Sequence, residues 1–421
     1  MFRLPLRPPL REPLRDAFLR AGNISQAIRA LFATGQQGAW YDPSDFSTLF
    51  QDSAGVTPVT AVEQPVGLMR DKSGRNNHAS QITAASRPVV SARVNLLVKS
   101  EQFDDAAWVK QSGTVVTVNT TIAPDGTLTA DNVAQTGNAI FQIVLFTATA
   151  GLFVTSSVYL RANSATTVTA NYNGNLAAPN NTLGTTTFNV TTAWQRFTHS
   201  KAVGATDNGL YLLLNGTSGQ DFQIWGAQFE PGAVAATRYQ RVNTASDYDT
   251  AGSPMYDRLD GVDDSMSSAT GGGGTAGFFF CQAVKPTGGA GLVRTLWSDT
   301  GANSGYRVQL DTLNQLSFSA GNGVAFTTIA AATATAVGTT HLLTVWDDGT
   351  NLNAQLGSGA VATIARPVVT AGTAGFTIGK DNGAATGFFT GNMYPEVYRQ
   401  TSLTAAERAQ AQAYVRSKAG L

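Results

Sequence analysis

Short runs of alternating apolar and polar residues fill the chain past Gly38, and they constrain its fold more than any other feature. The alternation is plain in residues 113–119, 153–160 and 341–346. A period of two places successive side chains on opposite faces of a β-strand. Dipeptides such as Asp348-Gly349 punctuate the runs and favour the positive φ angles that join antiparallel strands. Many short strands at this spacing predict a mainly β protein of antiparallel β-sandwiches or jelly rolls.

The two ends of the chain carry different patterns. Residues 4–16 repeat Pro-Leu-Arg, and the repeats contain Pro5, Leu6, Arg7, Pro9, Leu10, Arg11, Pro13, Leu14 and Arg15. Proline at every fourth position removes amide donors and fixes φ, so this arm is expected to run extended and to anchor the chain on a partner surface. The alternative is a disordered tail. Apolar residues at helical spacing between Asp16 and Phe32 predict a short helix after the arm, and the capping box of Thr404 and Glu407 predicts a C-terminal helix.

A sandwich pattern begins early in the chain and breaks off. It starts with AWYDPSD at residues 39–45 and continues with DKSGRNNHASQ from Asp71 and RP at Arg87. The chain then reads like the opening of another domain, until YDRLDGVDDSM at residues 256–266 resumes the first pattern. Together these motifs resemble the laminin-G-like, concanavalin A-like sandwich domains that are common in bacteriophage virion proteins. In that family the DKSG turn is followed within a few tens of residues by the DG-DD strand.

An inserted domain is the simplest account of this separation, because insertions are tolerated at surface loops whose ends lie close together. The predicted organisation is an anchoring arm and short helix at 1–38, a discontinuous concanavalin A-like sandwich at 39–92 and 246–421, and an inserted jelly roll at 93–245. It follows that strands from before residue 92 and after residue 255 are expected to lie in the same sandwich.

The predicted insert has a resemblance of its own. NLLVKSEQFDDAAWVK at residues 95–110, TSSVYLRA at 155–162 and FQIWGAQFEPG at 222–232 resemble a carbohydrate-binding-module-type jelly roll that recurs in phage tail fibres. This resemblance implies that the insert binds a glycan. The tryptophans inside these motifs, such as Trp108 and Trp225, are expected in the core rather than in a ligand platform.

Charge and hydropathy exclude several partners. The chain has 28 Lys and Arg residues against 28 Asp and Glu residues, so no basic footprint for nucleic acid spans it. No segment approaches the ~20 apolar residues of a membrane-spanning helix, and the N-terminus lacks the apolar core of a signal peptide. We therefore expect a protein made in the host cytoplasm, with no nucleic-acid partner and no membrane insertion. The single cysteine, Cys281, is expected to be buried in a strand.

Catalytic chemistry finds little support in the sequence. The three histidines are isolated from one another, and no nucleophile elbow or phosphate-binding loop occurs. Glycosidases need two carboxylates aimed at one glycosidic bond, whereas the glutamates of this chain are never paired. The expectation is a protein that is not an enzyme and that needs no organic cofactor.

Aspartates are densest around the resumed sandwich pattern. They are Asp247, Asp249, Asp257, Asp260, Asp263 and Asp264. Carboxylates on loops are the hard oxygen ligands that calcium requires, and the lectin-like resemblance implies calcium as well. The alternative is that these side chains accept hydrogen bonds from the backbone of their own turns.

Sugars are held by aromatic faces together with hydrogen-bonding groups. Aromatic and amide side chains that share a polar stretch are therefore candidates for glycan binding. The candidates are Tyr172, Asn173, Asn175, Trp297, Asp299, Tyr306, Phe388, Phe389 and Asn392. Each is expected to be exposed on a loop.

Two functions remain open at this point. The first is a phage tail fibre or tail-tip receptor-binding protein that attaches to a host-surface glycan, with its arm docked on other virion proteins. The second is a capsid head fibre or decoration protein held by the same arm. Both place the protein in the virion, and both are expected to be homotrimers, since fibres of this kind usually are and symmetric association would bury the short helix.

Overall fold

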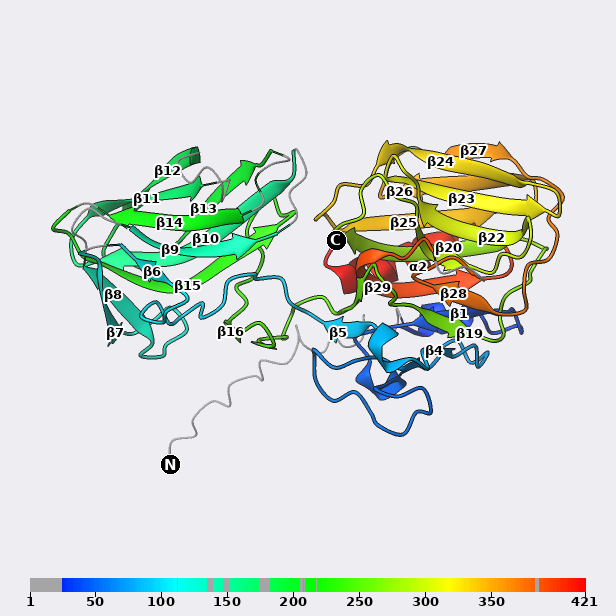
Figure 1. Cartoon of the computed structure of the whole chain (residues 1–421), viewed down its shortest axis with the longest axis horizontal. Helices are drawn as coiled ribbons and strands as arrows, with labels where there is room; N and C mark the ends of the chain where they lie inside the picture. Colours follow the sequence, from blue (N-terminus) through cyan, green and yellow to red (C-terminus); the bar gives the residue numbers. More distant parts are fainter. Residues whose placement is uncertain are drawn as a thin grey trace, which may run out of the picture.

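The computed structural model describes residues 25–111, 113–134, 139–146, 151–173, 182–204, 207, 209–216, 218–382 and 386–421. The fold is mainly β, and the paired strands of these residues run antiparallel in two sandwiches that lie side by side (Figure 1). The predicted fold class is therefore confirmed. The predicted anchoring residues of the arm lie outside the described residues.

The inserted sandwich is built from two five-stranded sheets. One has the order β13-β10-β15-β8-β7 and the other β12-β11-β14-β9-β6. The strands of the first are β7 (Val115–Thr121), β8 (Ala130–Ala134), β10 (Phe153–Ala162), β13 (Gln195–Ala202) and β15 (Phe222–Pro231). Those of the second are β6 (Val109–Lys110), β9 (Ala139–Leu145), β11 (Thr166–Asn173), β12 (Thr182–Val190) and β14 (Gly209–Gly216).

The alternation of β10 shows how the sequence builds this core. Val154, Val158 and Leu160 are buried between the sheets, while Tyr159 between them faces the other side. The partner strand β15 contributes Phe222 to the same core, opposite Ala162 of β10. Because residues directly opposite in a pair share a face, the period of two fixes the register of the pair.

The segments before and after the insert form a second sandwich, called the outer sandwich here, which combines an eight-stranded and a nine-stranded sheet. The eight-stranded sheet contains β1 (Gly38–Tyr41), β5 (Val89–Ser91), β18 (Tyr256–Asp260), β20 (Phe278–Pro286), β25 (His341–Asp347), β26 (Asn351–Leu356), β27 (Ala362–Ala365) and β29 (Thr390–Arg399). The nine-stranded sheet contains β2 (Leu49–Phe50), β3 (Leu68–Met69), β4 (Ala79–Ser80), β19 (Met266–Ser268), β21 (Arg294–Ser298), β22 (Ser304–Leu310), β23 (Gln315–Asn322), β24 (Phe326–Ala334) and β28 (Phe376–Ile378). Two 3-10 turns, η1 (Phe46–Thr48) and η2 (Ala84–Ser86), lie in the early segment.

Strands from either side of the insert pair within both sheets of the outer sandwich. Val90 of β5 lies opposite Asp257 of β18, and Ser80 of β4 lies opposite Ser267 of β19. The chain leaves this sandwich after β5 and returns through the hairpin of β16 (Val242–Thr244) and β17 (Asp247–Tyr248). Strands from before residue 92 and after residue 255 thus share one sandwich.

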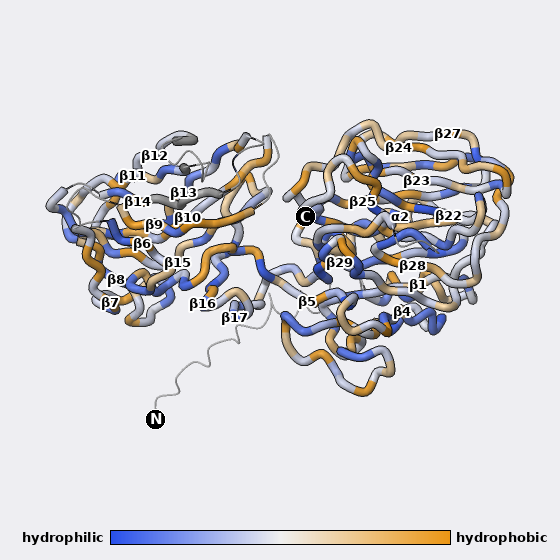
Figure 2. Tube along the Cα trace, viewed as in Figure 1, coloured by the Kyte–Doolittle hydropathy of each residue, from blue (hydrophilic) through white to orange (hydrophobic). Residues whose placement is uncertain are grey.

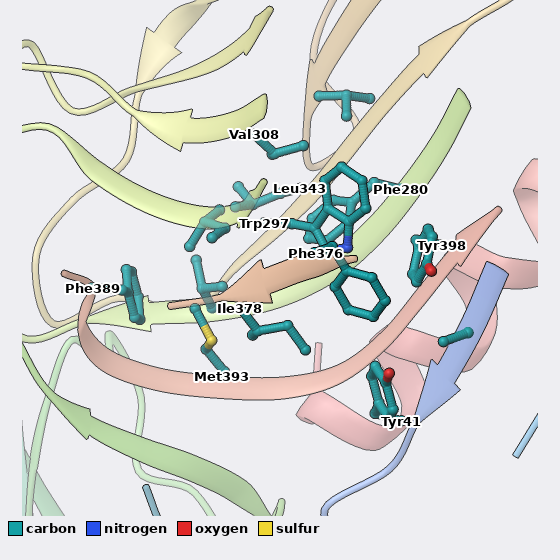
Figure 3. Packing of buried hydrophobic residues seen from close by; sticks show 14 of the residues in the cluster. Tyr41, Phe280, Trp297, Val308, Leu343, Phe376, Ile378, Phe389, Met393 and Tyr398 are labelled. Atoms are coloured by element: carbon teal, nitrogen blue, oxygen red, sulfur yellow. The ribbon is translucent and has the colours of Figure 1, made fainter. Parts of the chain in front are cut away.

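An aromatic core lies between the two sheets of the outer sandwich (Figure 3). The ring of Phe278 stacks on Tyr306, with centroids 4.8 Å apart, and contacts Trp297 at 4.9 Å. Trp297 is also 5.0 Å from Tyr398. Apolar residues recur along the strands of both sandwiches (Figure 2), so each domain has a core of its own.

Two helical segments pack against the outer face of the eight-stranded sheet. Helix α2 (Ala405–Ala419) has the predicted capping box at Thr404 and ends at Gly420, whose φ is 72°. Residues 25–30 are also helical, and Ile28, Leu31 and Phe32 are buried in one cluster with α2 and this sheet. The short helical segment is thus buried by its own chain, so its burial no longer argues for a trimer. None of the described helices is long and apolar enough to span a membrane.

Candidate functional site

A cleft of about 620 Å³ lies in the inserted sandwich, where the chain enters and leaves this domain. Its lining is rich in carboxylate, amide and basic side chains. The lining residues are Lys99, Glu101, Gln102, Asp104, Asp105, Val118, Asn119, Thr129, Asp131, Arg241 and Asn243. The volume falls within the range of small-molecule binding sites, about 300–1,000 Å³.

Backbone and side-chain hydrogen bonds hold the entry and exit segments together. The Lys99 N–H donates to Asn243 O at 3.2 Å, and the Ser100 N–H donates to Val242 O at 3.0 Å. The Ser100 hydroxyl accepts from the Val242 N–H at 2.9 Å. The buried Asn95 amide donates to the carbonyls of Ala227 and Gln240, at 3.0 Å each. One wall of the cleft therefore consists of two segments that are distant in sequence and fixed to each other.

The floor of the cleft is held by Asp131 on β8. This carboxylate is 1% exposed and accepts the Phe103 N–H at 3.0 Å and the Asn119 N–H at 2.9 Å. Burial raises the pKa of Asp131, and the two backbone donors act in the opposite direction. Asp131 therefore joins the entry segment to the β7–β8 connection.

Two residues that line the cleft adopt left-handed backbone conformations. The φ angles are 53° at Lys99 and 52° at Asn119. Asn tolerates this region, whereas a lysine adopts it at a cost of roughly 1–2 kcal/mol. The surrounding hydrogen bonds keep both residues in these conformations, which shapes the cleft before any ligand binds.

Glu101 connects the cleft to an aromatic cluster. The Tyr239 hydroxyl donates to Glu101 Oε1 at 3.0 Å, and burial raises the pKa of Glu101. The ring of Tyr239 lies 4.9 Å from that of Trp225, whose Nε1 donates to the cleft residue Thr129 at 3.1 Å. A polar cleft and an aromatic cluster are thus adjacent, joined through Glu101 and Thr129.

Both basic residues of the cleft already have acidic partners. Lys99 Nζ lies 3.6 Å from Asp105 Oδ2, and Arg241 Nη2 lies 3.2 Å from Asp249 Oδ1. Glu101 and Asp131 add further carboxyls to the lining. The cleft therefore offers more hydrogen-bond acceptors than free cations, which suits hydroxyl or amine donors of a ligand.

The predicted glycan-binding residues are not exposed as expected. Tyr172, Trp297, Tyr306, Phe389, Asp299 and Asn392 are buried, and Phe388 is half-buried. The aromatic rings among the buried set lie on the core sides of their sandwiches. Asn173 is the last residue of β11, and Asn175 lies outside the described residues. The prediction of exposed loop aromatics is wrong, and the reason is strand register: each buried ring occupies an inward position of a strand or lies beside one.

Asp299 serves the fold at this position. Its Oδ1 accepts the Tyr306 N–H at 2.6 Å and its Oδ2 accepts the Gly273 N–H at 2.7 Å. The Tyr306 hydroxyl donates to buried Asp347 at 2.6 Å. Asp299 and Tyr306, which were predicted to bind a glycan, are therefore hydrogen-bonded to each other in the interior.

Three of the six predicted calcium ligands come together. Ligand oxygens of Asp260, Asp263 and Asp264 lie within 4.8 Å of one another. However, Asp260 Oδ1 accepts the Val262 N–H at 2.8 Å, and Asp264 Oδ2 accepts the Asp260 N–H at 3.0 Å. The turn needs Gly261, because a Cβ there would lie 1.7 Å from Thr390 Oγ1. Three carboxylates could hold part of a calcium shell of six to eight oxygens, and part of their capacity is used by the turn itself.

The other three aspartates do not join this group. Asp247 accepts from Asn243 Nδ2 at 3.1 Å, and Asp249 pairs with Arg241. Asp257 is buried inside the outer sandwich, and burial raises its pKa to about 7. The expectation of one six-aspartate cluster is therefore wrong.

The residues of the cleft were not selected from the sequence as a site. SEQFDD at residues 100–105 concentrates three acids and one amide within a weakly charged chain, which is a usable signal. The other wall, at Arg241 and Asn243, carries no comparable signal, because its place beside residue 100 depends on the folded chain.

No protein family and no curated protein matches the chain. Solved structures match about a third of it. The carbohydrate-binding module of a Ruminococcus gnavus sialidase, bound to α2,3-sialyllactose, is 13% identical over 34% of this chain and 83% of that chain, with a TM-score of 0.29. A xylan-binding domain from Paenibacillus barcinonensis is 13% identical over 34% and 100%, with a TM-score of 0.27. Tailspike protein 4 of bacteriophage CBA120 is 16% identical over 34% and 22%, with a TM-score of 0.28. These values are too low for the likenesses to identify what the chain does.

Proposed function

We propose that this protein is a non-enzymatic appendage protein of a phage virion and that it attaches to a host-surface glycan through the cleft of its inserted sandwich. The motifs that resemble phage virion domains support the virion assignment. The cleft itself carries the binding proposal, because it is the place where a pocket of suitable size, many acceptors and an aromatic cluster meet.

The chemistry of the lining indicates which glycans fit. Sugar hydroxyls donate well to carboxylates, and Glu101 and Asp104 supply such acceptors in the lining. The cations Lys99 and Arg241 are held by Asp105 and Asp249, so an acidic sugar would meet a surplus of negative charge. We therefore expect neutral or amine-bearing glycans to bind better than sialylated or sulfated ones.

Substitutions in the cleft test the proposal. The full-length protein is assayed on a glycan array and on host cells, alongside Glu101→Gln and Gln102→Ala. Removing the charged acceptor of Glu101 should weaken binding by about tenfold or more, since hydrogen bonds to charged groups contribute roughly 1.5–3 kcal/mol. Gln37→Ala, on an exposed residue of the outer sandwich, is the matched control for Gln102→Ala. Full binding by both cleft variants would remove the cleft as the glycan site.

Location in the particle is tested separately. Cryo-electron microscopy of the virion should place the protein at the tail, as a tail fibre or tail-tip protein with its arm on neighbouring virion proteins. Density on the capsid would assign it as a head fibre instead. A mass measurement on the purified chain should give a homotrimer, and a monomer at micromolar concentration would contradict that expectation.

A further inference from the structure

Three polar side chains share one small cavity inside the outer sandwich. Asp257 of β18, Gln282 of β20 and Glu396 of β29 are 5%, 2% and 2% exposed and line a cavity of about 20 Å³. The remaining lining is mostly apolar or aromatic and consists of Tyr41, Pro43, Met69, Pro88, Leu259, Met266, Ile378, Met393 and Tyr394. Tyr41, Ile378 and Met393 are visible around this part of the core in Figure 3.

Strand register brings the three side chains together. Gln282 lies opposite Glu396, and Asp257 lies opposite Met393 on the same strand β29. Gln282 Nε2 donates to Glu396 Oε2 at 3.2 Å. Within the described part of the chain, Asp257 Oδ1, Gln282 Oε1 and Glu396 Oε1 are buried and have no hydrogen-bond partner. Three residues that line one cavity therefore each carry an oxygen without a partner.

No side chain that lines the cavity can serve all three oxygens. The lining contains no lysine, arginine or histidine, and the Tyr41 hydroxyl already donates to Asn77 O. A calcium ion would need six to eight oxygen ligands, more than this lining provides. A water molecule fits better, because a buried water makes about three hydrogen bonds and needs only about 10–15 Å³ of such a cavity.

We propose that the cavity binds one water molecule and that Glu396 is protonated and donates a hydrogen bond from its carboxyl O–H to the oxygen of this water. The water then donates its two hydrogens to Asp257 Oδ1 and Gln282 Oε1. One water and one proton thereby satisfy all three oxygens without a cationic side chain. Burial raises the pKa of Glu396 well above its usual range, which favours the protonated form.

The charged and titratable groups around the cavity are mainly acidic or neutral. Asp42, next to Tyr41 on β1, raises the pKa of Asp257 beyond the effect of burial, which brings it to about 7. The ammonium groups of Lys72 and Lys418 lie 3.3 and 3.2 Å from Asp42 and are engaged there. The other titratable groups nearby are Asp71 in the turn after β3, and Tyr394 and Tyr398 on β29. The facing strands contribute Met69, Met266 and Ile378, which do not titrate.

The sign of the pH effect follows from these raised pKa values. The folded state binds protons at Glu396 and Asp257 more tightly than the unfolded state does. The stabilisation is therefore fully present below the unfolded pKa values, about 4, and is lost as pH rises through the raised folded pKa values, of which that of Asp257 is about 7. The outer sandwich should be more stable in mild acid than at neutral pH.

Calorimetry of the full-length protein between pH 4 and pH 8 tests the proposal. Glu396→Gln keeps the shape of the side chain and cannot ionise, so its outer-sandwich transition should lie above that of the wild type at pH 8. The difference should shrink towards pH 4. Asp257→Asn should behave in the same way as pH rises through about 7, and Asp104→Asn on the insert should leave this transition unchanged. Equal pH profiles for wild type and Glu396→Gln would overturn the proposal.

Infrared spectroscopy gives a second readout that needs no destabilising variant. The wild type at pH 7 should show a stronger carbonyl band of protonated carboxylic acid than Glu396→Gln, in which the contribution of Asp257 remains. If Glu396→Gln does not fold, titration of this band in the wild type replaces the comparison, and a spectrum without it at pH 7 contradicts the proposal. A chelator that lowers the outer transition of the wild type but not that of Asp257→Asn would assign a cation to the cavity and would also overturn it.

Discussion

Each sandwich contains titratable groups whose pKa values are shifted by burial, and some of these groups oppose each other in their response to pH. The insert buries His199 beside the ring of Tyr172, with centroids 4.3 Å apart, and burial lowers the pKa of this histidine to about 4. The outer sandwich buries Asp257 and Glu396, and burial raises their pKa values. A buried neutral imidazole costs stability in acid, whereas a buried neutral carboxyl costs stability in base. The contributions of His199 and of these two carboxyl groups to stability therefore change with pH in opposite directions, although the pKa of Asp131 in the insert is also raised and that of His341 in the outer sandwich is also lowered.

The two domains also differ in where several of their carboxyl groups lie. In the insert several carboxyl groups line a surface cleft, with Glu101 and Asp131 bound by donors of their own domain. In the outer sandwich Asp257, Glu396 and Asp347 lie inside, and Asp347 pairs with Arg366 at 2.6 Å. Changes in the interior of the outer sandwich should therefore alter folding of that domain and leave the proposed glycan binding by the insert intact.

Removal of a core ring should give the largest separation between the domains. Trp297→Ala deletes a fully buried ring that contacts Phe278 and Tyr398. The outer sandwich should lose about 3–5 kcal/mol of stability, the usual cost of such a truncation. Calorimetry should show its transition at a lower temperature, with the transition of the insert unchanged. An equal fall of both transitions would show that the two sandwiches unfold as one unit.

A histidine variant tests how acid affects the stability of the insert. His199→Gln retains a hydrogen-bonding group beside Thr186, which lies 2.7 Å from His199 Nδ1, and it cannot be protonated. Because the folded pKa is about 4 against about 6.5 unfolded, acidification to pH 5 should cost the wild-type insert about 2 kcal/mol. Denaturant titrations at pH 7 and pH 5 should show this loss in the wild type and not in the variant. An unchanged acid loss in His199→Gln would assign it to other groups.

The sequence was sufficient for the features that depend on local order. Alternating strands identified the fold class, and the capping box at Thr404 and the glycine at Gly420 marked both ends of α2. The buried position of Cys281 in β20 follows from its apolar run in the same way. These signals are local because they depend on neighbours within a few residues.

The sequence did not predict which side chains are exposed or which residues form the cleft. Trp297 stands in a polar stretch, but its side chain is buried because the strand β21 places it inward, next to β28. The cleft combines residues 99–105 with Arg241 and Asn243, which meet only when the ends of the insert come together. Strand face and long-range pairing are properties of the whole sheet, so single motifs did not reveal them.

A helix cap offers a smaller test of the independence of the domains. Thr404 Oγ1 accepts the Glu407 N–H at 3.3 Å, and Glu407 Oε2 accepts the Thr404 N–H at 2.8 Å. Thr404→Ala should cost about 1 kcal/mol. Since α2 packs on the eight-stranded sheet, calorimetry should place this loss in the outer transition alone. Thr386→Ala, at an exposed position of the outer sandwich, is a control of the same chemistry.

The smallest effect is expected at the aspartate turn of the outer sandwich. Backbone N–H groups already occupy Asp260 Oδ1 and Asp264 Oδ2, and the Ser86 hydroxyl donates to Asp263 Oδ2 at 2.8 Å. A chelator should therefore leave the melting temperature of both domains unchanged, because the turn is complete without an ion. A fall in the outer transition that added calcium reverses, and that Asp263→Asn abolishes, would instead make this turn a calcium site. The stability of the outer sandwich would then depend on a bound ion as well as on its interior.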